Sequence, residues 1–60
     1  MTYQVIVTRE GDKWLADVPS VPGAQTYARS LDDLRRHVRE VIVLMDDLDD
    51  DALVDMRMVF

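Results

Sequence analysis

The sequence predicts a small α+β domain of order β-β-β-α-β, in which one helix packs on one face of a small, mostly antiparallel sheet. Three observations predict this fold class. Apolar residues alternate along residues 2–9 and again along residues 54–60, as they do in half-buried strands. Between these segments, residues 31–48 carry an apolar stripe at helical spacing. A chain of 60 residues has room for a single domain, residues 1–60.

The first two strands, residues 2–9 and 13–18, are expected to form a hairpin. Gly11 begins a two-residue turn between them, because glycine adopts the positive φ that tight hairpin turns require. If Glu10 pairs with Lys13, opposite charges meet beside the turn and the apolar faces of both strands coincide. That register predicts three further pairs: Arg9 with Trp14, Val7 with Ala16, and Val5 with Val18.

A short third strand is expected at residues 24–28. Pro19 and Pro22 end the second strand, because proline has no amide hydrogen to donate to a strand ladder. Pro22 and Gly23 fit the central pair of a type II turn, in which the second central residue needs a positive φ. This turn returns the chain into the third strand.

Ser30 is the predicted N-cap of a helix that runs from residue 31 to about residue 48. Asp32 and Asp33 complement the positive end of the helix, and Asp33 stands where a capping box carries Glu. Ion pairs at a spacing of four are expected on the outer face: Asp32–Arg36, Asp33–His37 and Arg36–Glu40. The inner face carries the apolar stripe: Leu31, Leu34, Val38, Val41, Ile42, Met45 and Leu48.

The helix is expected to cover the more apolar face of the sheet. A helical crossover lets the last strand, residues 54–60, run parallel to an earlier strand, and the first strand is the expected neighbour. The sequence leaves open whether this strand pairs within its own chain or is exchanged with a second copy. The face to be covered carries Val5, Val7, Trp14, Ala16, Val18, Met56 and Met58.

Charge and composition exclude several classes of function. Twelve acidic and seven basic residues give a formal net charge of −5, which disfavours direct contact with nucleic acid and suits a basic partner. With no cysteine and one histidine, no metal or cofactor is expected. The N-terminus lacks the pattern of a signal peptide, and the longest apolar run, residues 41–45, is too short to span a membrane. A cytoplasmic protein is therefore expected.

No residue pattern indicates catalysis, so no catalytic residue is assigned and the protein is not expected to be an enzyme. Metal-dependent cleavage of a phosphodiester needs several carboxylates at one site. The middle of the first strand, residues 5–7, has none, and the helix carries its acids at its ends and at Glu40. His37 is expected to be a partly buried helix residue that is hydrogen-bonded or paired with Asp33.

The sheet face that the helix leaves uncovered is the first candidate for binding a partner. It carries one apolar residue per strand, with Val59 continuing a row formed by Ile6, Leu15 and Tyr27. Scattered apolar residues on a surface need no explanation, but a row on a face without a helix is typical of an interface. The row is therefore a candidate for partner binding or self-association.

The segment after the helix is the second candidate. Its aspartates repel one another and oppose the negative end of the helix dipole, so they cost local stability. Three interpretations remain open: a solvated helix end, a cap by Asp49 or Asp50 on a short following turn, and an electrostatic docking site for a basic partner. The residues concerned are Asp46, Asp47, Asp49, Asp50 and Asp51.

Three short runs together resemble the HicB antitoxin family: Trp-Leu-Ala-Asp-Val-Pro at 14–19, Val-Pro-Gly-Ala-Gln-Thr at 21–26, and Ser-Leu-Asp-Asp-Leu at 30–34. That family has a strand ending in Val-Pro, a Leu-Pro-Gly turn followed by Cys and Thr, and a helix start of the form Thr-Leu-Glu-Glu-Ala. The resemblance spans residues 3–48. This chain departs from the pattern at four places: Ala24 for Cys, Ala28 for Gly, Ser30 for Thr, and Asp33-Leu34 for Glu-Ala.

The resemblance implies a partial ribonuclease-H-like fold and an antitoxin of a type II toxin-antitoxin system. Such a protein binds and occludes a small, basic HicA-like toxin that cleaves messenger RNA. Many relatives continue into a C-terminal DNA-binding domain, but none is expected within residues 1–60, and a DNA-binding role through a complex stays open. The alternative is a stand-alone homo-oligomeric structural or regulatory protein without a toxin. A homodimer or higher oligomer is expected, because so small a core leaves little surplus stability.

Overall fold

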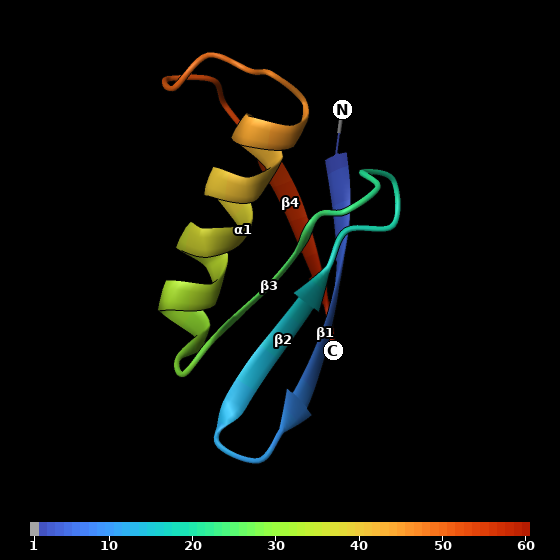
Figure 1. The fold of residues 1–60 in the computed structure, drawn as a ribbon, viewed down its shortest axis with the longest axis vertical. Coiled ribbons are helices and arrows are strands. Elements are labelled where there is room, and N and C mark those ends of the chain that lie inside the picture. The colour runs from blue at the N-terminus through green and yellow to red at the C-terminus, as the bar shows by residue number, and fades with distance from the viewer. Residues whose placement is uncertain (1) are drawn as a thin grey trace.

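The computed structural model, which describes residues 2–60, has a four-stranded sheet and one helix (Figure 1). The predicted order β-β-β-α-β is confirmed, and each predicted strand boundary lies within one residue of the observed one. The sheet order is β3-β2-β1-β4. The elements are β1 (Thr2–Glu10), β2 (Lys13–Asp17), β3 (Gln25–Ala28), α1 (Leu31–Met45) and β4 (Asp55–Val59).

The hairpin of β1 and β2 has the predicted register. Glu10 lies opposite Lys13, and Arg9 opposite Trp14, so the apolar residues of both strands share one face. Gly11 has a φ of +62°, whereas Asp12 is outside the left-handed region. This combination is typical of a type II′ turn, in which only the first central residue needs a positive φ. The turn and the alternation of apolar residues therefore specify the same pairing.

The connection from β2 to β3 is a pair of successive tight turns. The amide of Val21 donates to the carbonyl of Val18, and the amide of Ala24 donates to the carbonyl of Val21, both at 3.0 Å. Gly23 has a φ of +84°, as expected for the predicted type II turn at Pro22-Gly23. A third bond, from the amide of Val18 to the carbonyl of Ala24 at 3.0 Å, closes the loop and starts the pairing of β2 with β3.

The last strand pairs within its own chain. β4 runs parallel to β1, with Tyr3 opposite Met56 and Val5 opposite Met58. This is the predicted helical crossover, because a parallel neighbour needs a long connection and α1 supplies it. The parallel pair is the single exception in a sheet whose other pairs are antiparallel. β3 and β4 are left as the two edges of the sheet.

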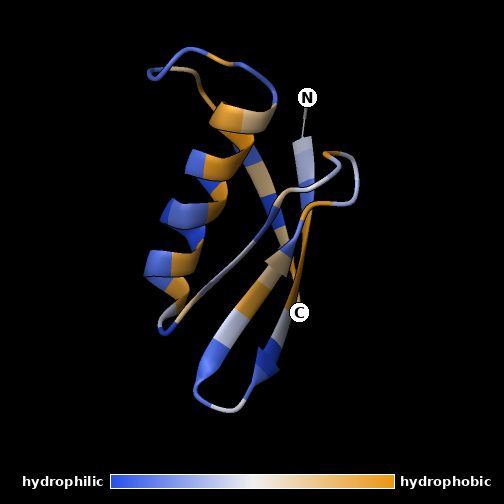
Figure 2. Ribbon diagram, in the orientation of Figure 1, coloured by the Kyte–Doolittle hydropathy of each residue, from blue (hydrophilic) through white to orange (hydrophobic). Residues whose placement is uncertain are grey.

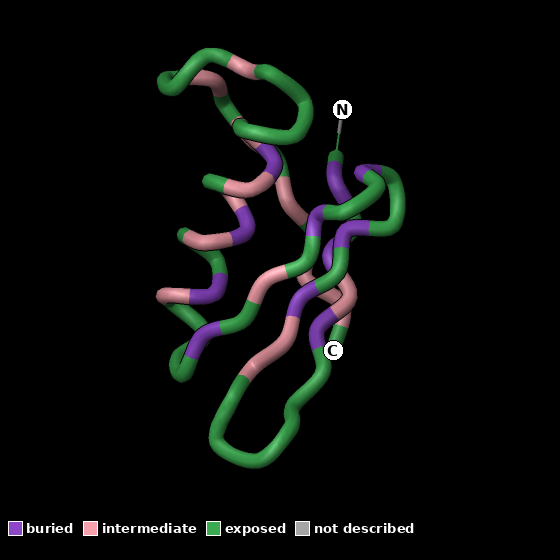
Figure 3. The backbone as a smooth tube through the Cα atoms, in the orientation of Figure 1, coloured by how far each residue is buried: buried purple, intermediate pink, exposed green. Residues whose placement is uncertain are grey.

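The core lies between α1 and the predicted apolar face of the sheet (Figures 2 and 3). On the helix, Leu34, Val38 and Ile42 have no exposed surface. They belong to one cluster with the apolar residues of β1, β2 and the loop before β3. The helix backbone approaches β3 and β2, not β1 or β4. Consequently Met56 and Met58 on β4 face the helix side but are only half-buried.

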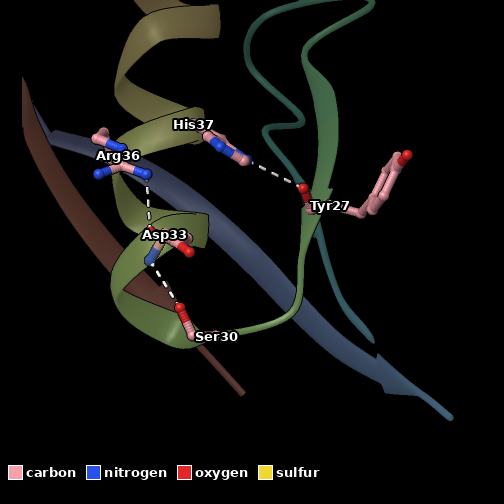
Figure 4. Close-up of polar contacts among 5 residues, drawn as sticks. All are labelled: Tyr27, Ser30, Asp33, Arg36 and His37. Carbon is pink, nitrogen blue, oxygen red and sulfur yellow. Dashed lines mark hydrogen bonds and ion pairs between the residues drawn. The ribbon is translucent and has the colours of Figure 1, made fainter. Parts of the chain in front are cut away.

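The start of α1 follows the predicted cap, with a different ion pair. Ser30 is extended, and its hydroxyl oxygen accepts from the amide of Asp33 at 3.2 Å (Figure 4). The Asp33 carboxylate pairs with Arg36 at 2.8 Å, one turn along the helix. The expected pairs of Arg36 with Asp32 and with Glu40 are wrong, because the spacing of three brings Asp33 equally close.

The end of α1 differs from the prediction. The helix ends at Met45, before the predicted end at Leu48. Asp47 has a φ of +54°, and two amides turn back to helix carbonyls: Leu48 donates to Val43 at 2.9 Å, and Asp47 donates to Leu44 at 3.4 Å. This is a Schellman motif with aspartate at the position usually held by glycine. The helical spacing of apolar residues predicted a longer helix because it includes Leu48. Leu48 does pack against the core, but it does so from the turn after the helix.

Replacing Asp47 with glycine should stabilise the protein. A residue with a Cβ is strained in the left-handed region, and glycine relieves that strain. Glycine also increases the conformational entropy of the unfolded chain, which offsets part of the gain. We expect Asp47→Gly to raise the free energy of unfolding by about 0.5–1 kcal/mol in chemical denaturation. Asp51→Gly removes the same charge at a residue outside the left-handed region, and it should not stabilise. Equal gains from both variants would contradict the backbone explanation.

Candidate partner-binding surface

The predicted apolar row exists as a continuous feature of the uncovered sheet face. Leu15 lies directly opposite Tyr27, and Ile6 lies directly opposite Val59. Ile6 and Leu15 are diagonal neighbours across β1 and β2, because Thr8 is the residue opposite Leu15. Register therefore places one apolar side chain from each of the four strands in line across the sheet.

Part of this face is hollowed. A shallow depression of about 430 Å³ crosses β1, β2 and β3. Its floor is apolar, with Ile6 and Leu15 half-buried, and its rim is polar. Tyr27 stands at the edge with 59% of its surface exposed. The side chains that line the depression include Ile6, Thr8, Leu15, Asp17, Gln25 and Tyr27.

Tyr27 is held in place through its backbone. The Nδ1 atom of His37 lies 3.1 Å from the carbonyl oxygen of Tyr27, while the ring of Tyr27 points away from the helix (Figure 4). The expectation that His37 pairs with Asp33 is therefore wrong. A ring nitrogen facing a carbonyl must donate, which fixes the tautomer of a neutral imidazole. The bond ties the helix to the edge strand whose tyrosine completes the row.

A cation lies over the exposed tyrosine. The Nζ atom of Lys13 is 5.2 Å from the centroid of the Tyr27 ring. On the helix side of the same hairpin, the guanidinium of Arg9 lies 4.8 Å from the Trp14 ring, and Phe60 meets that ring edge-on at 6.2 Å. Cations over aromatic faces contribute about 0.5–1 kcal/mol at exposed sites. Both aromatic rings thus have a cation over one face within the chain itself.

All five aspartates of the acidic segment are exposed. One of them nevertheless makes a specific contact: the hydroxyl of Tyr3 donates to the Asp46 carboxylate at 2.6 Å. This hydrogen bond, together with desolvation and the negative charge of Asp46, raises the pKa of Tyr3 above its usual 10.0. The contact joins the first strand to the end of the helix.

A basic side chain holds the acidic loop in shape. One guanidinium nitrogen of Arg39 donates to the carbonyl oxygens of Asp50 and Ala52, at 2.8 and 2.9 Å. Between them the chain makes a tight turn, closed by the amide of Ala52 donating to the carbonyl of Asp49 at 2.9 Å. Backbone carbonyls, not aspartate side chains, therefore make these contacts. No sequence pattern indicates the role of Arg39, because it depends on the loop folding back onto the helix.

The two groups of candidate residues do not form one surface. The apolar row faces away from the helix, whereas the acidic segment continues from the end of α1 and crosses to β4 (Figure 1). Tyr3, which contacts Asp46, projects to the helix side. None of the five aspartates lines the depression on the open face.

Two further findings concern residues 2–60. No three His, Asp or Glu side chains in this part of the chain come close enough together to hold a metal ion. No helix in the described part is both long enough and apolar enough to cross a membrane.

Comparison with known proteins gives one relative. The chain is 38% identical over 45 residues to a protein of Archaeoglobus fulgidus named UPF0150 protein. The matched region covers 73% of this chain and 65% of the length of that relative. No family model matches the chain, and no solved structure matches it. The similarity supports at most a shared family for the two proteins.

The contact of Tyr3 with Asp46 predicts a dependence of stability on alkaline pH. Because the folded pKa of Tyr3 is raised, the contact stabilises the fold fully below pH 10.0, and its contribution falls as pH rises through the folded pKa. Tyr3→Phe should therefore be less stable than the natural protein at pH 8, and the difference should shrink above pH 10.0. Chemical denaturation across this range measures it.

The matched control uses Asp46→Ala as the background. Without its acceptor, Tyr3 loses the two effects of Asp46 on its pKa and keeps only the effect of burial, so adding Tyr3→Phe should cause a clearly smaller pH-dependent difference. A difference between Tyr3→Phe and the natural protein that stays constant from pH 8 to beyond pH 10 would show that the hydrogen bond does not control the titration.

Proposed function

We propose that this protein is a HicB-like antitoxin of a type II toxin-antitoxin system, which binds and occludes a small, basic HicA-like toxin that cleaves messenger RNA. It acts in the cytoplasm by stoichiometric binding, without turnover. The resemblance across residues 3–48 supports this function. The 38% identity to the UPF0150 protein over 45 residues shows that much of this chain has a counterpart in another protein, and the function is inferred from the resemblance.

The observation that carries the proposal is the uncovered apolar row. Four strands form the sheet, but the single helix covers one face, so the row of Ile6, Leu15, Tyr27 and Val59 lies on the uncovered face, with Tyr27 exposed and the other three half-buried. A contiguous apolar patch with a polar rim marks a protein-binding surface. The depression beside Leu15 provides a pocket for a side chain of the partner.

Charge supports a basic partner. The formal net charge is −5, and five exposed aspartates lie in one short segment. Such a field accelerates the encounter with a positively charged protein and orients it before contact. Binding to the open face then excludes the messenger RNA by covering the active surface of the toxin.

Co-expression with a small, basic HicA-like protein from a neighbouring reading frame tests the proposal. We expect a stable complex and rescue of growth from the toxin. A tight homo-oligomer that binds no such protein and rescues no growth would contradict the proposal and favour the stand-alone alternative.

Placing a charge in the apolar row should prevent binding. Leu15→Asp puts a carboxylate in the depression, where a partner would have to desolvate it. We expect affinity for the toxin to fall at least thirtyfold, about 2 kcal/mol, in a titration by calorimetry. Leu44→Asp is the matched control, because Leu44 is 77% exposed on the helix. Unchanged affinity of a folded Leu15→Asp protein would exclude this face.

Neutralising the acidic segment should slow association and leave dissociation nearly unchanged. Replacing Asp49, Asp50 and Asp51 with Asn removes three charges from the exposed acidic segment. We expect the association rate at low salt to fall about tenfold and its salt dependence to flatten. Stopped-flow mixing at several salt concentrations measures both.

The control for this experiment removes the same number of charges elsewhere, at exposed residues: Glu10→Gln, Asp12→Asn and Asp32→Asn. If this variant slows association as much as the first, net charge alone matters, and the acidic segment has no local role in docking.

A further inference from the structure

The outer edge of β4 has no strand paired with it in the described chain. The sheet order leaves β4 with β1 on one side and no strand of residues 2–60 on the other. The helix backbone approaches β2 and β3 but not β4. An exposed edge presents free amide and carbonyl groups that pair readily with another strand. The β4 strand also carries two apolar side chains, Met56 and Met58, which are only half-buried.

The residues that flank this strand are more exposed still. Leu53 is fully exposed, and Phe60 has 73% of its surface exposed. The bond from Arg39 to the carbonyl of Ala52 fixes the chain immediately before Leu53. A large apolar side chain is therefore held in solvent next to an unpaired strand edge. Nothing else in the described chain contacts this edge as a strand partner.

We propose that β4 is the dimer interface of this protein. Two copies pair through their β4 strands, antiparallel about a two-fold axis, with Met56 of each copy opposite Met56 of the other. The two four-stranded sheets become one continuous sheet of eight strands. The occupant of the edge is a second copy of this chain, because the sequence of β4 is complementary to itself in this register.

Charge selects among the three registers that are centred on residues 55–57. A two-fold axis must place one residue of the strand opposite its own copy. An axis at Asp55 would bring two aspartates together, and an axis at Arg57 would bring two arginines together; like charges directly opposite destabilise a strand pair. An axis at Met56 instead places Asp55 opposite Arg57 twice, once on each side of the axis. Both residues are exposed in the monomer, so both are free to pair.

The same register pairs apolar side chains on both faces. On the helix side, Val54 lies opposite Met58. On the open side, Leu53 lies opposite Val59, which is the β4 member of the apolar row. The exposed leucine thus gains an apolar neighbour, and the row of one copy extends onto the other. This interface shares Val59 with the apolar row but lies outside the depression at Leu15, so it does not rest on the proposed function.

Cysteine cross-linking tests the register, because the chain contains no natural cysteine. Residues directly opposite in an antiparallel pair have Cα atoms about 4.5–5.5 Å apart, within the range for a disulfide. Met56→Cys should form a covalent dimer when oxidised with copper phenanthroline in dilute solution. Met58→Cys should not, because Met58 lies opposite Val54. A mixture of Val54→Cys and Met58→Cys should cross-link across the two chains.

Charge reversal tests the same interface without oxidation. Asp55→Arg or Arg57→Asp alone places like charges opposite each other, and the dimer dissociation constant should rise about tenfold in sedimentation equilibrium. The double variant restores both pairs and should return to within about threefold of the natural protein. Asp12→Arg, in the exposed hairpin turn, is the matched control and should leave the dimer intact.

Three results would each overturn the proposal. The natural protein remains a monomer at millimolar concentration, Met58→Cys cross-links to itself as well as Met56→Cys does, or the double charge reversal fails to restore the dimer that the single variants lose. None of these results bears on toxin binding, which is measured with Leu15→Asp on the other surface. Failure of the dimer and failure of the antitoxin function are therefore distinguishable.

Discussion

Burial of Leu34, Val38 and Ile42 against one face of the sheet is the interaction on which the rest of this structure depends. A single helix lies against one face of a sheet, and with its side chains it is about 10–12 Å wide, so it covers about two strands spaced about 4.8 Å apart. The helix lies over β2 and β3, where the small buried residues Ala16 and Ala28 allow close approach. Everything that remains exposed follows from this geometry: one whole face, and the β4 side of the other.

The acidic segment shows how the fold tolerates an unfavourable arrangement of charge. Aspartates at the C-terminal end of a helix oppose its dipole and repel one another. Two sets of contacts offset this: the hydroxyl of Tyr3 donates to Asp46, and Arg39 donates to two loop carbonyls. None of these contacts neutralises Asp49, Asp50 or Asp51, so their field reaches into solvent. That is the property required for attracting a basic protein.

The two exposed regions have different physical characters, which suits different partners. The open face is a shallow apolar surface with a depression and a polar rim, and it resembles the core and rim of a protein interface. The edge of β4 offers backbone groups and an alternation of charge that is complementary to itself. An antitoxin that dimerises through the edge would keep both open faces free, so that each copy would bind its own toxin.

The sequence by itself determined the elements, the hairpin register and the apolar row. These depend on short-range patterns: alternation along strands, glycine at the two turns, and Ser30 before the helix. The tertiary structure alone decided where α1 ends, since Leu48 continues the helical period although it packs from a turn. It also decided that His37 bonds to Tyr27 and that Arg39 holds the acidic loop. These contacts join residues that are distant along the chain, and no local pattern encodes them. Their geometry exists only after the helix has packed on the sheet.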